Sequence, residues 1–334
     1  MSTGHPDSGL RLVADIGGTH ARFAVAAPGS DKLSHDLELS TPDYPDLAAA
    51  VTDYLARAKP GRVTQAAVAI ANPITGDRLK MTNGKWEFSV KETQKKLGLE
   101  RLILLNDFAA LALAVPVLSA SALRKVGSEG KKAAEAPIAL IGPGTGLGVS
   151  ALIPDGGPGI PVAGEGGHVT AGATNAREEA ILAFLRQRYE HVSAERLLSG
   201  PGMVNIHEAL SAIDGKPAQK IEAPQITQQG LSGGDAQCVE VLELFCAWLG
   251  SVAGDCALTL GARGGVYIGG GIVPRLGSFF DRSTFRRRFI AKGRMGVLLE
   301  GIPVYIIDAP HAALAGSLVA LEHNVRTGSN VEAR

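Results

Sequence analysis

Cysteine, aromatic residues and an excess of either charge are all scarce in this sequence. Three of the 334 residues are cysteine and 5% are aromatic, and 33 basic residues balance 33 acidic ones. Three cysteines are too few for a disulfide framework or a four-ligand zinc site, so we expect Cys238, Cys246 and Cys256 to be reduced core residues. Because the chain has no net charge, it lacks an overall positive field that would attract nucleic acid.

Long hydrophobic runs are also missing. No stretch approaches the ~18 consecutive apolar residues of a membrane helix, and the N-terminal sequence MSTGHPDSG is polar. We therefore expect a soluble, cytoplasmic protein that binds no membrane. The densest basic run, the three arginines at 286–288, is interpreted as the solvated face of a helix.

Short apolar runs, typical of buried strands, alternate with longer segments of helical period. Strands are expected at residues 10–16, 21–27, 65–71, 102–105, 138–141, 148–153, 266–268 and 304–307. Helices are expected at residues 45–59, 107–115, 178–189, 235–260 and 311–322. The alternation predicts an α/β fold, and the length suggests two domains. The charged stretch 119–136 is the best candidate for a boundary.

Two segments repeat one pattern when Thr19 is aligned with Thr145. They are LVADIGGTHARFAVA and ALIGPGTGLGVSALI, each an apolar strand, a glycine-rich turn with Gly-Thr, and a second apolar strand. Such a turn joins antiparallel strands as a hairpin whose backbone N–H groups and threonine hydroxyl can bind an anion. We expect both tips to face a ligand in a cleft between two similar α/β halves.

Three well-known glycine motifs do not account for these turns. Every Gly-Lys pair lacks the earlier glycine of a P-loop, and the sequences from Gly142 and Gly269 lack the last glycine of the dinucleotide fingerprint. Residues 230–234 match the G-x-S-x-G elbow of hydrolases, but no buried strand precedes them. We interpret those residues as the start of the helix at Asp235.

Five segments resemble, in order, the signature segments of bacterial glucokinases, which belong to the sugar kinase, Hsp70 and actin superfamily. They are DIGGT at 15–19, LND at 105–107, GPGTG at 142–146, EGGH at 165–168 and GGGIVPR at 269–275. The resemblance implies a two-domain, actin-like ATPase (ribonuclease H-like) fold with an interdomain cleft. The small domain would be residues 10–117 plus 309–325, and the large domain residues 118–308. The implied reaction is ATP-dependent phosphorylation of glucose to glucose 6-phosphate.

The resemblance also implies the nucleotide site. The six hairpin residues Gly17, Gly18, Thr19, Gly144, Thr145 and Gly146 would bind the phosphates of ATP, since glycine has no Cβ to keep an oxygen away. A turn before a helix N-terminus, Gly269, Gly270 and Gly271, would hold the α-phosphate and ribose. Mg²⁺ binds few carboxylates and keeps its waters, and Asp15 is its expected ligand. Asp15 could instead cap its own turn.

Five residues match the glucose-binding positions of the family: Asn106, Asp107, Glu165, His168 and Glu195. Asp107 also matches its catalytic base. An aspartate at a helix N-terminus should have a low pKa, but a loose phosphoryl-transfer transition state needs its base only late. Structural alternatives stay open, because Asn and Asp are common N-caps, a lone histidine often has a structural role, and Glu195 also suits a surface position.

Other functions fit parts of the pattern. One is a kinase for another hexose or an N-acetylated hexosamine. Another is a non-catalytic sugar-responsive regulator, and a third is an ATP-driven chaperone or filament. The related repressor-and-kinase group carries a cysteine-rich zinc loop, whereas this chain has no cysteine before Cys238. The first expected strand begins at Leu10, so we expect no DNA-binding domain ahead of it. The family is commonly dimeric, which makes a homodimer a further expectation.

Overall fold

The structure, a computed structural model, describes residues 9–82, 84–127, 130–217 and 219–328. The chain forms two compact units. Of the described residues, unit 1 contains those within 9–120, 152–163 and 309–328, and unit 2 contains those within 121–151 and 164–308. Residues 152–163, which the sequence analysis assigned to the large domain, fall in unit 1.

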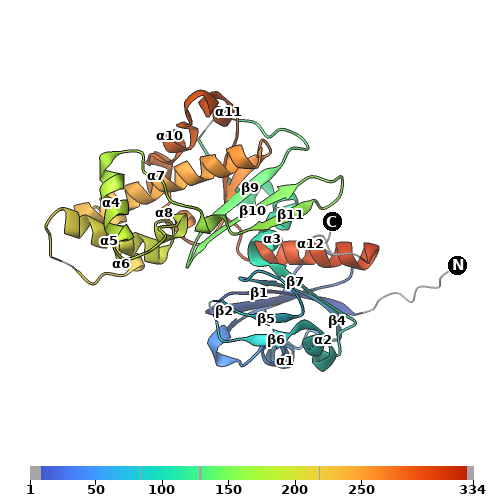
Figure 1. Cartoon of the computed structure of the whole chain (residues 1–334). Helices are drawn as coiled ribbons and strands as arrows, with labels where there is room; N and C mark the ends of the chain where they lie inside the picture. Colours follow the sequence, from blue (N-terminus) through green and yellow to red (C-terminus); the bar gives the residue numbers. More distant parts are fainter. Residues whose placement is uncertain (1–8, 83, 128–129, 218, 329–334) are drawn as a thin grey trace. The chain divides into compact units, whose positions relative to one another are not determined.

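Unit 1 is built on a five-stranded sheet in the order β3-β2-β1-β4-β7 (Figure 1). The strands are β1 (Leu10–Ile16), β2 (His20–Ala26), β3 (Ser34–Ser40), β4 (Val63–Ile70) and β7 (Arg101–Asn106). A separate two-stranded sheet pairs β5 (Arg78–Lys80) with β6 (Glu87–Ser89). The helices are α1 (Leu47–Ala58), α2 (Val90–Leu97), α3 (Asp107–Ala114) and α12 (Ala312–Thr327). β1, β4 and β7 run parallel, so their carboxyl ends meet at one edge.

Helix α12 packs closely on α3, as their neighbouring ribbons show (Figure 1). Gly316 of α12 makes this possible, because a Cβ at that position would lie 1.7 Å from the carbonyl oxygen of Ala110. That oxygen is backbone and cannot rotate away. The contact between the two helices therefore requires glycine at this point of α12.

Gly316→Ala should destabilise the protein by about 2 kcal/mol or more, since overpacking a rigid contact outweighs the better helix propensity of alanine, which is worth about 1 kcal/mol. The midpoint of urea denaturation measures this. Gly172→Ala is the matched control, because a Cβ there would meet nothing within 4 Å. Equal midpoints for Gly316→Ala and the parent would contradict the packing argument.

The second large sheet has six strands in the order β11-β10-β9-β12-β13-β8, and β8, β9, β12, β13 and most of β10 belong to unit 2. Residues 152–153 of β10 and residues 160–163 of β11 belong to unit 1. The strands are β8 (Leu123–Val126), β9 (Ile138–Pro143), β10 (Leu147–Ile153), β11 (Ile160–Gly164), β12 (Gly265–Ile268) and β13 (Val304–Ile307). Four longer helices are α4 (Ala176–Arg186), α5 (Gly200–Ile213), α6 (Ala223–Ser232) and α7 (Ala236–Thr259). Short helices follow at α8 (Ile272–Leu276), α9 (Ser278–Arg282), α10 (Phe285–Ile290) and α11 (Gly296–Glu300).

The long helix α7, orange in Figure 1, carries all three cysteines. Their thiols are free, and Cys238 and Cys246 are buried as predicted, whereas Cys256 is only partly buried. Burial raises the pKa of Cys246 to about 12. By length and composition α7 could also cross a membrane, but 67% of its most apolar window is buried within the protein. We therefore interpret α7 as a core helix of unit 2.

The prediction that residues 286–288 form a solvated face is wrong. Arg286 donates a hydrogen bond of 2.9 Å to the carbonyl oxygen of Glu300. Arg288 pairs with Glu178, and these side chains are only 12% and 1% exposed. Among the three arginines the middle one is exposed. The run therefore fixes α10 against its neighbours, which periodicity alone could not reveal.

Helices α5 and α6 were not predicted, and the interpretation of residues 230–234 needs correction. These residues end α6 before α7 begins: Gly233, with φ of 71°, is the C-cap of α6. The side chain of Asp235 then caps α7 by accepting a 2.8 Å hydrogen bond from the Cys238 amide. The glycine-rich segment is a helix-to-helix turn.

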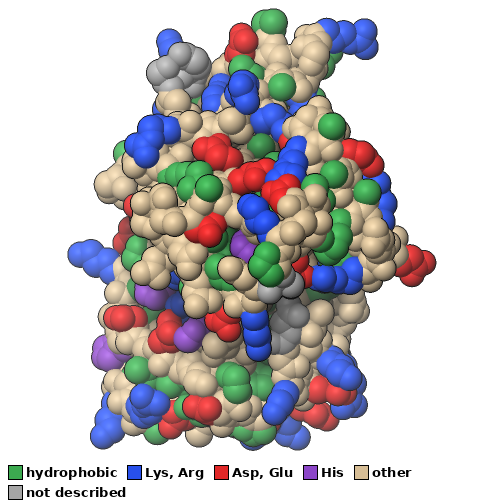
Figure 2. Space-filling view, turned by 90° about the vertical axis from the view of Figure 1, so that its left-hand side faces the viewer, with side chains coloured by type: hydrophobic (Ala, Val, Ile, Leu, Met, Phe, Trp, Pro, Cys, Tyr) green, Lys and Arg blue, Asp and Glu red, His purple; other side chains and the backbone are tan. Residues whose placement is uncertain are grey.

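Acidic and basic side chains are interspersed over the face of the molecule in Figure 2. This mixture agrees with the balanced composition, 33 residues of each sign. An even distribution of charge gives that face no broad attraction for a polyanion.

Candidate functional site

The second glycine hairpin, between β9 and β10, is fixed at its tip by backbone hydrogen bonds. Within the turn, the Gly144 amide donates to the carbonyl of Gly146 over 2.8 Å. The Gly200 amide donates to the carbonyl of Gly144 over 2.9 Å. On the other side, the Leu147 amide donates to Oε2 of Glu195 over 2.9 Å. Residues 195–200 therefore hold both sides of the tip.

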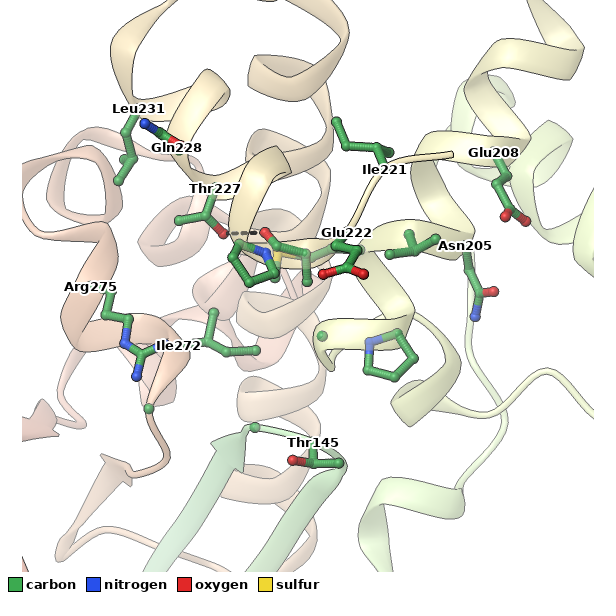
Figure 3. Close-up of a pocket in the computed structure, with 18 of the residues that line it drawn as sticks. Thr145, Asn205, Glu208, Ile221, Glu222, Thr227, Gln228, Leu231, Ile272 and Arg275 are labelled. Atoms are coloured by element: carbon green, nitrogen blue, oxygen red, sulfur yellow. Dashed lines mark hydrogen bonds between the residues drawn. The ribbon is translucent and has the colours of Figure 1, made fainter. Parts of the chain in front are cut away.

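A cavity of about 1060 Å³ opens beside this tip in unit 2 (Figure 3). Figure 3 shows Thr145 on the hairpin, Ile272 and Arg275 on α8, and Thr227 and Leu231 on α6. The lining combines apolar, amide, cationic and anionic side chains, and it includes Gly144, Thr145, Gly200, Asn205, Glu208, Glu222, Gln228, Leu231, Gly271, Ile272 and Arg275. Such a cavity suits a ligand with one flat apolar part and one anionic part.

The glycine turn after β12 packs against the end of β9. The Gly269 amide donates to the carbonyl of Ile141 over 2.9 Å. Gly270 has φ of 77°, and a Cβ on it would lie 2.4 Å from the carbonyl oxygen of Pro143. Gly271 lines the cavity. The first two glycines therefore allow the turn to reach β9, and the third faces the ligand space.

Three predicted sugar-site residues share one region of unit 2. Glu165 precedes the short 3-10 turn Gly166–His168, His168 ends it, and Nε2 of His168 lies 4.0 Å from Oε2 of Glu165. Both side chains are exposed, at 60% and 61%. The turn packs directly on β10, because a Cβ at Gly167 would lie 2.1 Å from the carbonyl oxygen of Leu147. Glu195 bonds to the amide of the same Leu147.

The first glycine hairpin, between β1 and β2, is also fixed by a residue later in the sequence. Its turn closes through the Gly17 amide, which donates to the carbonyl of His20 over 2.9 Å. The Thr41 amide donates to the carbonyl of Thr19, and the Thr41 hydroxyl donates to the carbonyl of Gly17, both over 2.9 Å. Gly18 lies within this turn. Thr41 thus fixes the tip of the first hairpin.

Asp15 lies near the end of β1 with its carboxylate 22% exposed and 3.8 Å from the Arg22 guanidinium. Burial raises the pKa of Asp15 above its usual range, while Arg22 and His311 oppose that shift. A partly buried carboxylate gains from a nearby cation. No three His, Cys, Asp or Glu side chains gather into a metal cluster within the described residues. One carboxylate is a donor of the kind that Mg²⁺ takes when phosphates and water supply its other ligands.

Asp15→Asn should stabilise the ligand-free protein at neutral pH, because it removes a buried charge. The raised pKa means that the native state holds its proton to higher pH than the unfolded chain does. The stabilisation should therefore shrink as the pH falls through that raised pKa and disappear below the unfolded-state pKa. Melting temperatures of variant and parent, compared at neutral pH and at successively lower pH, test this. If Asp15→Asn were less stable than the parent at neutral pH, the raised pKa of Asp15 would be contradicted.

Asn106 and Asp107 lie where β7 ends and α3 begins. The side-chain oxygen of Asn106 accepts hydrogen bonds from the amides of Phe108 and Ala109, at 2.9 and 3.1 Å. Asn106 is therefore the N-cap of α3, the structural role that the sequence left open for it. Asp107 accepts from the Phe108 amide over 2.9 Å. Asn106 pairs in register with Ile70, which pairs with Ile16, so Asp15 and Asp107 belong to the same edge of the sheet.

The predicted residues are thus divided between the units. Unit 1 holds Asp15, Gly17, Gly18, Thr19, Asn106 and Asp107, and unit 2 holds Gly144, Thr145, Gly146, Glu165, His168, Glu195, Gly269, Gly270 and Gly271. Three of them, Gly144, Thr145 and Gly271, line the cavity.

The cavity residues on α5 and α6 were missed by the sequence analysis. Two start signals mark these helices. Ser199 precedes Gly-Pro and caps α5. Its hydroxyl oxygen accepts a hydrogen bond of 3.0 Å from the Gly202 amide. Glu222 precedes Ala-Pro-Gln225, and its amide donates to the Gln225 side chain over 3.0 Å. A capping residue followed by proline in the first turn is a recognisable N-terminus.

Comparison with known proteins identifies the family of the chain. The family model that matches is Glucokinase, over residues 12–324. The chain is 53% identical over 317 residues to a curated Glucokinase of Chromobacterium violaceum, covering 95% of this chain and 90% of the relative. Among solved structures, a glucokinase from an Antarctic psychrotroph aligns with a TM-score of 0.84 at 35% identity, covering 94% of this chain and 99% of that one.

A more distant solved structure shares the fold. A ROK family glucokinase from Streptomyces griseus, solved in complex with glucose and AMPPNP, aligns with a TM-score of 0.62 at 21% identity, covering 92% of this chain and 98% of that one. Together with the first structural match, this confirms the predicted actin-like ATPase fold class.

Proposed function

The chain belongs to the glucokinase family, and we propose that it transfers the γ-phosphoryl group of ATP to the 6-hydroxyl group of glucose. The observation that carries the proposal in the structure is the cavity beside the second glycine hairpin, which contains Gly144, Thr145 and Gly271. Glucose as the preferred hexose, a cytoplasmic location and a homodimer are further parts of the proposal that rest on family membership.

The cavity supports a role in nucleotide binding. Leu231 and Ile272 offer apolar surface for an adenine ring, and the Arg275 guanidinium offers a positive charge for phosphate oxygens. The backbone amide and hydroxyl of Thr145 add donors at the hairpin tip. In unit 1, the amides of Gly17, Gly18 and Thr19 would contribute in the same way.

The carboxylate of Asp15 is an oxygen donor of the kind that Mg²⁺ prefers. Bound there together with the phosphates, Mg²⁺ would supply neutralisation of phosphate charge. No lysine of the P-loop kind exists in the sequence to provide that charge. The chain's own contribution is a partly buried carboxylate whose raised pKa reflects the lack of solvation.

Sugar binding is assigned to Asn106, Asp107, Glu165, His168 and Glu195. Carboxylates and an imidazole can each accept from or donate to hydroxyl groups, and a site built from them discriminates against analogues that leave those groups unpaired. In unit 2 the packing of the Gly166–His168 turn on β10 fixes Glu165 and His168. In unit 1 the α3 N-terminus fixes Asn106 and Asp107.

In the reaction, Asp107 would orient the 6-hydroxyl group of glucose and accept its proton. The hydroxyl oxygen forms the new bond to the γ-phosphorus while the bond from that phosphorus to the bridging oxygen of ADP breaks. Since little covalent work is required of the protein, positioning dominates. A carboxylate held at a helix N-terminus is suited to a proton transfer that occurs late.

Asp107→Ala should lower kcat about 10²- to 10⁴-fold, the usual contribution of a general base, while glucose binding persists in part. A coupled assay of glucose-dependent ADP release gives kcat, and calorimetry gives the glucose Kd. Asp46→Asn is the matched control, because Asp46 caps α1 in the same unit. Asp107→Ala turning over at near the parent rate would make the base assignment wrong, and a parent without glucose-dependent ADP release would refute the proposed function.

A further inference from the structure

Glu195 contacts the second glycine hairpin, and it also lies near the predicted sugar residues Glu165 and His168. Its Oε2 accepts a hydrogen bond of 2.9 Å from the amide of Leu147, the first residue after the turn. The side chain is half-buried, and its own backbone carbonyl accepts from the Ser199 hydroxyl over 2.8 Å. Glu195 is therefore held at its backbone carbonyl and at one of its two carboxylate oxygens.

Gly146 provides a second, independent sign of this link. A Cβ at Gly146 would lie 2.5 Å from Oε2 and 3.4 Å from Cδ of Glu195. Its φ is not in the left-handed region, so the backbone alone does not require glycine. A Cβ at Gly144, by contrast, would meet nothing within 4 Å. The two glycines of one turn thus differ: Gly146 makes room for the Glu195 carboxylate, and Gly144 does not.

Other contacts extend the link on both sides. The amide of Ala194 donates to the carbonyl of Val169 over 2.8 Å, which joins the residue before Glu195 to the segment that carries Glu165 and His168. The Gly200 amide bonds the opposite side of the hairpin tip at Gly144 over 2.9 Å. Residues 194–200 therefore contact both the segment that follows the Gly166–His168 turn and the second glycine hairpin.

We propose that Glu195 is a positioning residue that couples the hexose site to the second phosphate hairpin: one carboxylate oxygen fixes the Leu147 amide while the other is used by the sugar. This rests on the proposed function, because it assumes that glucose contacts Glu195. Because the Leu147 amide already holds one carboxylate oxygen, a change that displaces the carboxylate weakens the hairpin tip and the sugar contact together.

The first hairpin lacks this arrangement. Thr41 fixes it through an amide and a hydroxyl, and Thr41 is not among the predicted sugar residues. Coupling through a side chain shared with the sugar is therefore a property of the second hairpin. A purely structural Glu195 would not need to lie in the sugar region at all.

The first test measures MgADP binding by calorimetry with no sugar present. Glu195→Ala should weaken MgADP binding about tenfold, because a charged acceptor is lost from the Leu147 amide. Glu195→Gln has a side-chain oxygen that can still accept from the Leu147 amide, so its MgADP binding should lie within about twofold of the parent. MgADP affinity unchanged in Glu195→Ala, or not rescued in Glu195→Gln, would overturn the proposal.

The second test approaches from the hairpin and measures glucose binding with no nucleotide present. Gly146→Ala should weaken glucose binding about tenfold, because its Cβ displaces Glu195, whereas Gly144→Ala should leave the glucose Kd within about twofold. Equal glucose affinities for the two variants would overturn the coupling.

These experiments separate the two proposals and do not depend on one variant folding. A parent that binds no glucose would refute the proposed function. A parent that binds glucose and MgADP, with variants that show no cross-effect, would refute the coupling alone. If Glu195→Ala fails to fold, the comparison of Gly146→Ala with Gly144→Ala still decides, because those changes leave the Glu195 side chain present.

Discussion

A glycine turn can offer its amides to phosphate only while the rest of its backbone is fixed, and the candidate site depends on that constraint. In unit 1, Thr41 bonds the carbonyls of Gly17 and Thr19. In unit 2, the Gly200 amide and the Glu195 carboxylate bond the two sides of the second tip. In both hairpins a segment later in the sequence supplies the restraint, so the shape of each tip depends on the folded chain.

Sheet geometry then places the chemistry. Parallel strands end at one edge, and β1 and β7 bring Asp15 and Asp107 to the same edge of the first sheet. In the second sheet, β9 and β12 are parallel neighbours, so the turn after β12 lies against the end of β9 and presents Gly271 to the cavity. In both sheets, therefore, the candidate residues lie at or just after the carboxyl ends of parallel strands, where ligands of open α/β sheets usually bind.

Much of this could be predicted from the sequence, for physical reasons. Strands at 10–16 and 304–307 were predicted with the observed bounds, because both are short and mostly apolar, as buried strands usually are. Helices α5 and α6 were missed because glycine, proline and polar residues obscure their period. Arg286 and Arg288 were misjudged since their partners lie on distant segments. The dependence of Gly146 on Glu195 was invisible for the same reason, as it exists only in three dimensions.

The central claim is that the chain transfers phosphate from ATP to a sugar hydroxyl. ³¹P NMR of the purified protein incubated with ATP, Mg²⁺ and glucose tests it most directly, with N-acetylglucosamine in place of glucose as the comparison. The account predicts equal amounts of ADP and glucose 6-phosphate, no inorganic phosphate beyond the background, and no ADP without sugar. Release of inorganic phosphate without a sugar phosphate, or phosphorylation of N-acetylglucosamine in preference to glucose, would contradict it.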